Sequence, residues 1–336
     1  PEKRGPAYYV NETTMSCNAT SGFVGGDKTH VQLTFNGNDF TAENENLVYT
    51  FYNVFGSFPR SGPADSYDES ILVKGAGFKT TAHVMCSLNR TTVPALEVSP
   101  NLIRCPMALS SKDPSVTGNI KFGISIDGSW TDFGNFYYYD QITLNDMQPR
   151  VGPAEGEGII YFYGKDFRDN FVNVEIGCKI GESIGQGVLI DAGTIRCTIE
   201  EMELVNEGET LPSYLALNSY SWVGGSTAPI GFVPYGITGV YPNSGPYTGY
   251  TDILITGKGF SDDMAERAKC RFGVDTNYVS VDAEVLDYNK MICRSPADFK
   301  VPSSSDETIS VPIGIGFLEE EFRPWTEDLH RFSFYV

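Results

Sequence analysis

The stretch NSGPYTGYTDILITGKGF, residues 243–260, holds a Gly-Pro turn, a short apolar run and a second glycine turn that ends on phenylalanine. Two near copies lie upstream, RSGPADSYDESILVKGAGF at 60–78 and RVGPAEGEGIIYFYGKDF at 150–167. A proline introduces each copy, at Pro59, Pro149 and Pro242. Self-similarity at a regular period is the mark of a repeat architecture, so we predict a chain built from repeated domains.

The cysteines recur with the same period as these turns. Cys86, Cys178 and Cys270 lie 92 residues apart, and a second set follows them after 19, 19 and 23 residues, at Cys105, Cys197 and Cys293. A covalent partner has to keep a fixed place in each copy. We therefore predict one disulfide per repeat, namely Cys86–Cys105, Cys178–Cys197 and Cys270–Cys293.

The cysteines could also be buried free thiols or ligands of a zinc ion. Buried free thiols are the usual state of cysteine in cytosolic chains. A zinc site is disfavoured because no CxxC spacing occurs and the three histidines, His30, His83 and His330, lie at unmatched places.

The seventh cysteine, Cys17, ends an eleven-residue stretch that resembles those before the second cysteine of each repeat. The four stretches are AYYVNETTMSC (7–17), ALEVSPNLIRC (95–105), GVLIDAGTIRC (187–197) and AEVLDYNKMIC (283–293). We therefore expect residues 1–53 to be the C-terminal half of a further repeat, whose front half, with the partner of Cys17, is missing. On this interpretation the chain is a segment of something longer. The alternative is that Cys17 pairs with a second copy of the protein.

The period of about 92 residues is a common size for a domain with one core. We place the complete repeats at 54–141, 142–236 and 237–336. Asn53 is almost the whole connection between the aromatic run that ends at Tyr52 and the next repeat. Such short joints favour a semi-rigid array of domains.

Local pattern predicts strands throughout. The 35 glycines and 19 prolines interrupt helical periods, and only SDDMAERAKC (261–270) could form a short helical turn. Apolar residues alternate along 122–126 and 309–317, as in strands with one buried face. The expected fold is all-β, with tandem immunoglobulin-like antiparallel sandwiches. In NFYYYD (135–140) we expect Tyr138 to face outward.

Composition excludes some partners. A net charge of −19 argues against binding nucleic acid, because a polyanion would be repelled. The longest clean apolar run is the five residues IIYFY (159–163), far short of a membrane span.

Three Asn-x-Thr sequons, at Asn11, Asn18 and Asn89, agree with an oxidising compartment, and we predict that all three carry glycans. The expected localisation is extracellular or at the cell surface.

The repeated line, Pro-x-x-Gly-Pro, then a strand, then Gly-x-Gly-Phe, with CRFG (270–273) shortly after, resembles the IPT/TIG domain. This immunoglobulin-like fold is found in plexin and hepatocyte-growth-factor-receptor ectodomains, in large secreted or ciliary surface proteins and in Rel-type transcription factors. The resemblance covers essentially the whole chain, counting the half repeat. The second repeat departs from it at Asp166 and at CKIG (178–181). Such a fold implies little about function.

No constellation of catalytic residues stands out. Asp127, Asp132 and the acidic runs 199–209 and 318–322 could be acid/base groups or calcium ligands, but the calcium-loop spacing is absent and we expect solvated loops. We therefore expect no enzyme activity, no cofactor and no metal.

Our leading hypothesis is a secreted, glycosylated, disulfide-bonded structural protein that self-associates into a cell-surface or extracellular fibre. The alternative is an adhesion or receptor ectodomain that binds a protein or glycan ligand.

Overall fold

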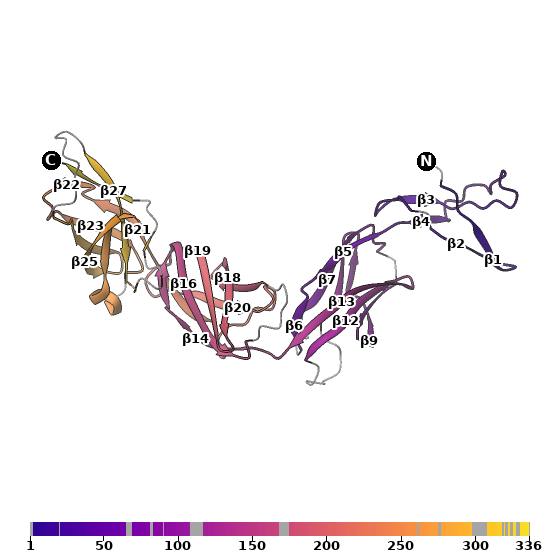
Figure 1. The fold of residues 1–336 in the computed structure, drawn as a ribbon, viewed down its shortest axis with the longest axis horizontal. Helices are drawn as coiled ribbons and strands as arrows, with labels where there is room; N and C mark the ends of the chain where they lie inside the picture. The colour runs from indigo at the N-terminus through magenta and orange to yellow at the C-terminus, as the bar shows by residue number, and fades with distance from the viewer. Residues whose placement is uncertain are drawn as a thin grey trace. The chain divides into compact units, whose positions relative to one another are not determined.

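The computed structural model describes residues 3–335, apart from 20, 65–68, 81–82, 90, 108–116, 168–174, 261, 275–276, 298–307, 318, 320–321, 323–324 and 327–329. The only regular helical element within these residues is a 3₁₀ turn, η1 (Asp262–Arg267), and the other elements are strands. The predicted all-β fold is confirmed. The chain divides into two compact bodies, Pro1–Asp140 and Gln141–Val336 (Figure 1).

The N-terminal segment contains two separate hairpins. The first pairs β1 (Ala7–Asn11) with β2 (Thr14–Cys17), and the second pairs β3 (Lys28–His30) with β4 (Val48–Thr50). Each forms a two-stranded sheet of its own among the described residues.

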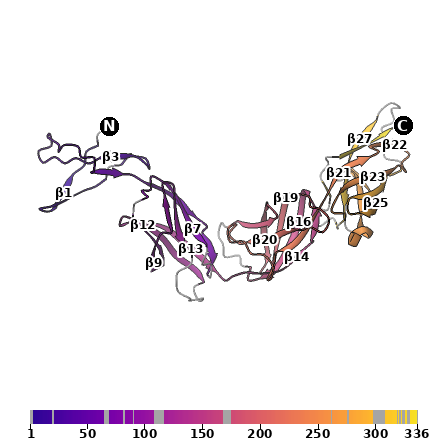
Figure 2. The same ribbon diagram turned by 180° about the vertical axis from the view of Figure 1, so that it is seen from behind.

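The first repeat is a sandwich of two sheets. One has the order β10-β11-β7-β5 and the other β6-β13-β12-β8-β9, so that β7 and β13 lie in opposite sheets (Figures 1 and 2). The strands are β5 (Asn53–Phe58), β6 (Ser61–Pro63), β7 (Ser70–Ala76), β8 (Val84–Leu88), β9 (Thr91–Pro94), β10 (Glu97–Ser99), β11 (Leu102–Pro106), β12 (Gly118–Ile126) and β13 (Ser129–Tyr139).

The second repeat has the same plan, with one long strand, β18, in place of β9 and β10. β18 pairs with β17 through its first half and with β19 through its second, and so belongs to both sheets. The strands are β14 (Thr143–Gln148), β15 (Val151–Pro153), β16 (Glu155–Lys165), β17 (Ile176–Ile180), β18 (Ser183–Asp191), β19 (Thr194–Glu201), β20 (Leu211–Ala216) and β21 (Ile230–Tyr241).

The third repeat again uses one long strand, β25, to join its two sheets. Its first strand is the second half of β21, which pairs with β23. The remaining strands are β22 (Ser244–Pro246), β23 (Asp252–Lys258), β24 (Lys269–Val274), β25 (Asn277–Asp287), β26 (Lys290–Arg294), β27 (Ile309–Gly316) and β28 (His330–Tyr335).

The repeated Gly-Pro turn has the same place in each sandwich. It forms a three-residue strand, β6, β15 or β22, which pairs in parallel with β13, β21 or β28 respectively. Each of these partners is the last strand of its repeat. The turn therefore ties the start of each domain to its end, and this explains why the motif recurs.

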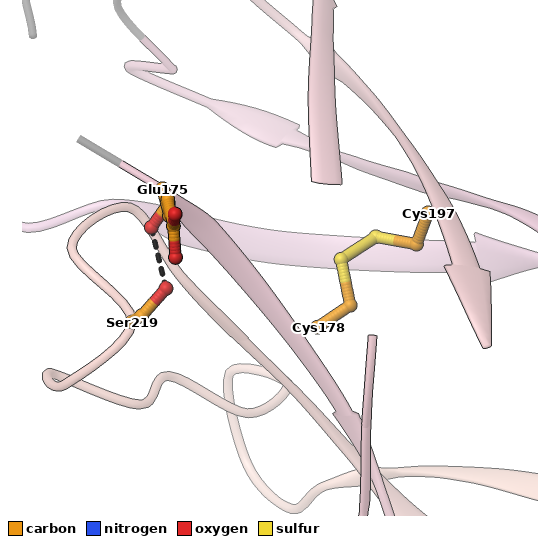
Figure 3. The surroundings of a disulfide bond; sticks show 4 residues. All are labelled: Glu175, Cys178, Cys197 and Ser219. Carbon is orange, nitrogen blue, oxygen red and sulfur yellow. Dashed lines mark hydrogen bonds between the residues drawn. A yellow bond between two sulfur atoms is a disulfide. The ribbon is translucent and has the colours of Figure 1, made fainter. Parts of the chain in front are cut away.

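The disulfides link the two sheets of each sandwich. Cys86–Cys105, Cys178–Cys197 and Cys270–Cys293 are bridged, with Cα atoms 5.8, 6.2 and 6.2 Å apart, and all six cysteines are fully buried. Figure 3 shows the second bridge, with the Ser219 hydroxyl donating a hydrogen bond to the Glu175 carbonyl beside it. Each bridge therefore passes through the centre of a core.

The first glycine of the Gly-x-Gly-Phe turn has no room for a side chain in any of the three repeats. A Cβ on Gly75 would lie 2.2 Å from the Phe78 ring and 2.3 Å from the Asn53 carbonyl oxygen. Gly164 and Gly257 are crowded in the same way by Phe167 and Phe260, three residues further on. The phenylalanine rings fill the core against bare backbone, so a side chain at the glycine would displace them.

The second glycine of the turn is required for a different reason. Gly77 and Gly259 both have φ of +78°, in the left-handed region that glycine adopts freely. Asp166, at this place in the second repeat, has φ of +65° and so keeps the same turn. Aspartate is among the few residues with a side chain that tolerate this conformation.

Tyr138 is buried, and the expectation that it faces outward is wrong. In the pairing of β12 with β13, Phe136 lies opposite Ile120, a core residue, and this sets the inward phase at Phe136 and Tyr138. The Tyr138 hydroxyl donates to the Met107 carbonyl, and burial raises the pKa of this hydroxyl above its usual value. Tyr137 is the partly exposed residue of the run.

Two glycines of the first repeat test the crowding directly. We expect Gly75→Ala to destabilise this repeat by about 2–3 kcal/mol, because the new methyl group meets the Phe78 ring and a backbone carbonyl. Gly56→Ala is the matched control, since a Cβ at Gly56 on the neighbouring strand meets no atom within 4 Å. Calorimetry of the full chain measures both, and equal shifts in the two variants would contradict the crowding.

The disulfide pattern predicts the result of non-reducing peptide mapping. Cys178 should be recovered bonded to Cys197, and a Cys178→Ala/Cys197→Ala variant should lose about 3 kcal/mol in the second repeat. Unfolding of the first repeat, which lies in the other compact body, serves as the internal control. Recovery of Cys178 with any other cysteine would refute this pattern of cross-links.

Candidate functional site

The three sequon asparagines are exposed. Asn11 ends β1, Asn18 follows β2, and Asn89 lies in the turn after β8. The Asn11 Oδ1 atom accepts hydrogen bonds of 3.0 Å from both the backbone N–H and the hydroxyl of Thr13. Two further residues of these sequons, Thr20 and Arg90, lie outside the described residues. Glycans at these asparagines would project from the surface.

Of the acidic residues considered as catalytic or calcium-binding groups, Asp127 lies in a turn, but Asp132 lies in β13, so the expectation of a loop is wrong for Asp132. Asp127 Oδ1 accepts the backbone N–H of His83 at 2.9 Å, and Asp132 Oδ1 accepts that of Gly134 at 2.8 Å. In the part of the chain that the structure describes, no three His, Cys, Asp or Glu side chains gather in a way that could hold a metal ion. Leu318, Glu320 and Glu321 of the second acidic run lie outside the described residues.

The acidic run 199–209 is only partly a solvated loop, and the expectation is wrong for its start, because residues 199–201 belong to β19 and Ile199 is buried. The glutamates at 200, 201, 203, 207 and 209 are exposed, but Met202 is buried. Asn206 Oδ1 accepts a hydrogen bond of 2.9 Å from Lys258 Nζ on β23. The loop therefore packs against the third repeat while its carboxylates remain in solvent.

Tyr288 adds a second polar contact between this loop and the third repeat. Its hydroxyl lies 3.4 Å from the carbonyl oxygens of both Val205 and Asn206. Burial, and then the charges of Glu207 and Glu209, raise the pKa of the Tyr288 hydroxyl. The hydroxyl is therefore held in its neutral, donating form.

The joint between the second and third repeats contains no linker. β21 pairs with β20 over Ile230–Phe232 and with β23 over Gly236–Tyr241, so one strand serves both sandwiches. Tyr235 is fully buried in the core cluster of the third repeat, where its ring meets Phe317 edge-on at 4.9 Å. A side chain from the end of one domain thus completes the core of the next.

The outer face of β18 carries an aliphatic row that sequence analysis missed. Ile184, Val188 and Ile190 are 66, 50 and 53% exposed. The intervening inward positions include Gly185 and Gly187, where a Cβ would lie 2.0 Å from the Thr198 carbonyl oxygen and 2.6 Å from Ile176 respectively. The sequence signal for this row was the glycines that alternate with the aliphatic residues. The glycines face the core, and the aliphatic side chains face solvent.

In two other parts of the chain an exposed apolar residue lies at this strand position or directly beside it. Val188 pairs with the residue just before Cys197. The equivalent residues are Tyr8 and Glu284, each of which pairs with the residue just before the corresponding cysteine. In the first repeat Glu97 is the residue paired with Arg104, just before Cys105, and its neighbour Leu96 donates its N–H to the Arg104 carbonyl. Tyr8 and Leu96 are 54 and 61% exposed. We call Tyr8, Leu96, Val188 and Glu284 the outer row.

The described residues contain no helix of the length and hydropathy that a bilayer crossing requires.

Comparison with solved structures finds distant likenesses. The plexin A4 extracellular region, domains 1 to 10, is 17% identical with a TM-score of 0.36, over 84% of this chain and 24% of that one. A second plexin A4 structure, with domains 1 to 8, is 13% identical with a TM-score of 0.31, over 87 and 35%. Chicken CNTN1 FN1–FN3 is 7% identical with a TM-score of 0.17, over 84 and 97%. The chain spans about a quarter of the larger plexin region.

Comparison with curated proteins finds no match. The IPT/TIG domain model matches residues 53–139 and 234–316, together about half of the chain. The first match begins at β5 and ends at the last residue of β13, and the second begins on the shared strand β21. The chain belongs to the IPT/TIG domain family.

Proposed function

We propose that this chain is part of an extracellular or cell-surface protein, in which tandem IPT/TIG domains form a non-catalytic scaffold of the adhesion or receptor type. The three buried bridges support this, because disulfides persist mainly in oxidising compartments. The exposed sequon asparagines agree with a secretory route.

The observation that carries a scaffold role is the joint at β21. A flexible linker would let two domains turn independently, whereas here a single strand, the Tyr235 ring and the 203–209 loop all connect them. Domains joined in this way present their faces in a fixed relation. Such a relation suits recognition of an extended partner more than catalysis in a pocket.

The outer face of β18, with Ile184, Val188 and Ile190, is the surface that we assign to a protein partner. All three side chains are apolar and at least half exposed, on a chain whose net charge is −19. These side chains lose contact with water when a partner covers them. The partner would therefore present an apolar surface of its own.

Assembly into a fibre is the second candidate, favoured by the recurrence of the outer row in successive parts of the chain. Similar sites repeated along a chain would let two copies contact each other at several points. In that case the partner surface belongs to other copies of this protein.

Substitution at the outer row tests the proposed function. We expect cells of the source organism to adhere to surfaces coated with the wild-type chain, and adhesion to fall about tenfold for Val188→Glu, which places a charge in the contact. The fold should tolerate this change, because Glu284 occupies the same position in the third repeat. Leu286→Glu, at an exposed site of that repeat, is the control.

The alternatives give different results in the same samples. Equal adhesion by the wild type and Val188→Glu would contradict the assigned surface. Filaments of the wild type in negative-stain images that vanish in Val188→Glu would replace adhesion by fibre assembly.

Occupancy of the sequons tests the compartment. We expect secretion from a eukaryotic host to yield glycans at Asn11, Asn18 and Asn89, since all three side chains are exposed. Glycosidase treatment should convert each occupied asparagine to aspartate, as detected by peptide mass. Thr13→Ala should remove the first glycan only. A protein that leaves the host with all three asparagines unmodified would count against this prediction.

A further inference from the structure

The N-terminal segment has exposed apolar side chains and an exposed cysteine. Tyr9, Phe35 and Leu47 are 69, 86 and 55% exposed, and Cys17 is exposed with a free thiol. The cysteines at the corresponding place in the repeats, Cys105, Cys197 and Cys293, are fully buried.

The β1–β2 hairpin is the same hairpin as β18–β19 and β25–β26. Ala7 pairs with Cys17, as Gly187 pairs with Cys197 and Ala283 with Cys293. All three hairpins also have a register shift at the same place, two to four residues beyond that pair. Matching register and irregularity show that β2 holds the position of the central cysteine strand of a sandwich.

In the repeats this central strand is paired along both edges. The residue across its second edge from the cysteine is Ile71, Ile160 or Ile253, and each of these is at most 1% exposed. Among the described residues β2 pairs only with β1. Its second edge thus offers backbone hydrogen-bonding groups in a register that the rest of the chain defines.

The second hairpin has a matching open edge. The strand next to the closing strand of each repeat pairs with the strand of the first cysteine, as in Cys86↔Ile124, Cys178↔Leu215 and Cys270↔Ile315. β3 precedes the aromatic closing strand β4 and pairs only with β4 within the described part of the chain. Among the described residues, no strand therefore pairs with the second edge of β2 or with the second edge of β3, whereas both edges are paired in the repeats.

The geometry points to an acceptor site: β2 and β3 bind a cysteine-bearing pair of β-strands of the same repeat type, which covers Tyr9 and Met15 and forms a disulfide with Cys17. The first of these strands carries an isoleucine opposite Cys17, and its cysteine follows about 15 to 18 residues later, as from Ile71 to Cys86 and from Ile160 to Cys178. Recognition is by strand addition, in which backbone hydrogen bonds give affinity and side-chain pockets give register.

A second copy of this chain fits the site poorly. Its own segments of the required type, 61–86, 151–178 and 244–270, already pair within their own sandwiches and have bridged cysteines. A direct Cys17–Cys17 bridge would leave the open edge of β3 unpaired. The occupant is thus a polypeptide segment of this repeat type whose cysteine carries a small thiol as a mixed disulfide, and Cys17 displaces that thiol.

A peptide with the sequence of residues 246–274 tests the site on the whole chain. Its Cys270 is supplied as a mixed disulfide with glutathione. The Cys17 thiolate attacks the peptide sulfur, glutathione leaves as the thiolate, and no further oxidant is needed. We expect the Cys17–Cys270 product to form about tenfold faster than with an Ile253→Asp peptide, because strand pairing raises the effective concentration of the disulfide.

The Ile253→Asp peptide and a scrambled peptide, each with the same mixed disulfide, measure simple thiol reactivity. Mass spectrometry follows the product, and hydrogen exchange should show slower exchange in β2. Equal rates for all three peptides, or a Cys17–Cys17 dimer as the main product, would overturn strand acceptance by the free peptide.

A fusion removes the dependence on the peptide folding alone. Residues 242–282 are joined directly to Ala7, because Ala283 and Ala7 occupy the same register position. Oxidised glutathione is the oxidant in this experiment, and it is reduced to two thiols as the two cysteines bridge. We expect Cys17 to be bridged to the added cysteine and to resist alkylation, whereas the same fusion with Ile253→Asp in the added segment remains reactive. If Cys17 in the first fusion is alkylated as fast as in the parent chain, the proposal is wrong.

Discussion

The fold depends on the central strand that carries the second cysteine of each repeat. β11, β19 and β26 are paired on both edges, and from each the sulfur bridge crosses to the opposite sheet. A sandwich of about 92 residues has only a few kcal/mol to spare, and a closed loop of 19 residues adds roughly 3 kcal/mol. The turns, the isoleucines opposite the cysteines and the glycine-phenylalanine packing are all arranged around this strand.

Much of this arrangement could be predicted from the sequence, because it depends on constraints that act on single residues or on residues close together in the chain. A Gly-Pro turn, a Gly-x-Gly-Phe turn and a cysteine at fixed spacing each need a particular residue at a particular place. The departure at Asp166 preserved the turn, since aspartate can adopt the φ that glycine adopts in Gly77 and Gly259.

Other features depend on neighbours that one segment does not reveal. Alternation shows that every second residue of a strand faces the core, but not which of the two sets does so. The burial of Tyr138 therefore follows only from the pairing of Phe136 with Ile120. On β18 the usual rule is inverted at two inner positions, because the backbone of β19 and the Ile176 side chain leave room only for glycine at 185 and 187. The contact of the 203–209 loop with Lys258 joins residues of two repeats, and no local pattern encodes it.

The covalent loops also limit how far a pulled chain can lengthen. A residue in a fully extended chain spans about 3.4 Å, so a bridge across 19 residues withholds roughly 65 Å from any stretching of its domain, and one across 23 residues roughly 80 Å. The withheld part includes the centre of the core. Under tension, only the chain outside each bridge can lengthen, and the segment between the two cysteines stays closed as long as the bridge is intact.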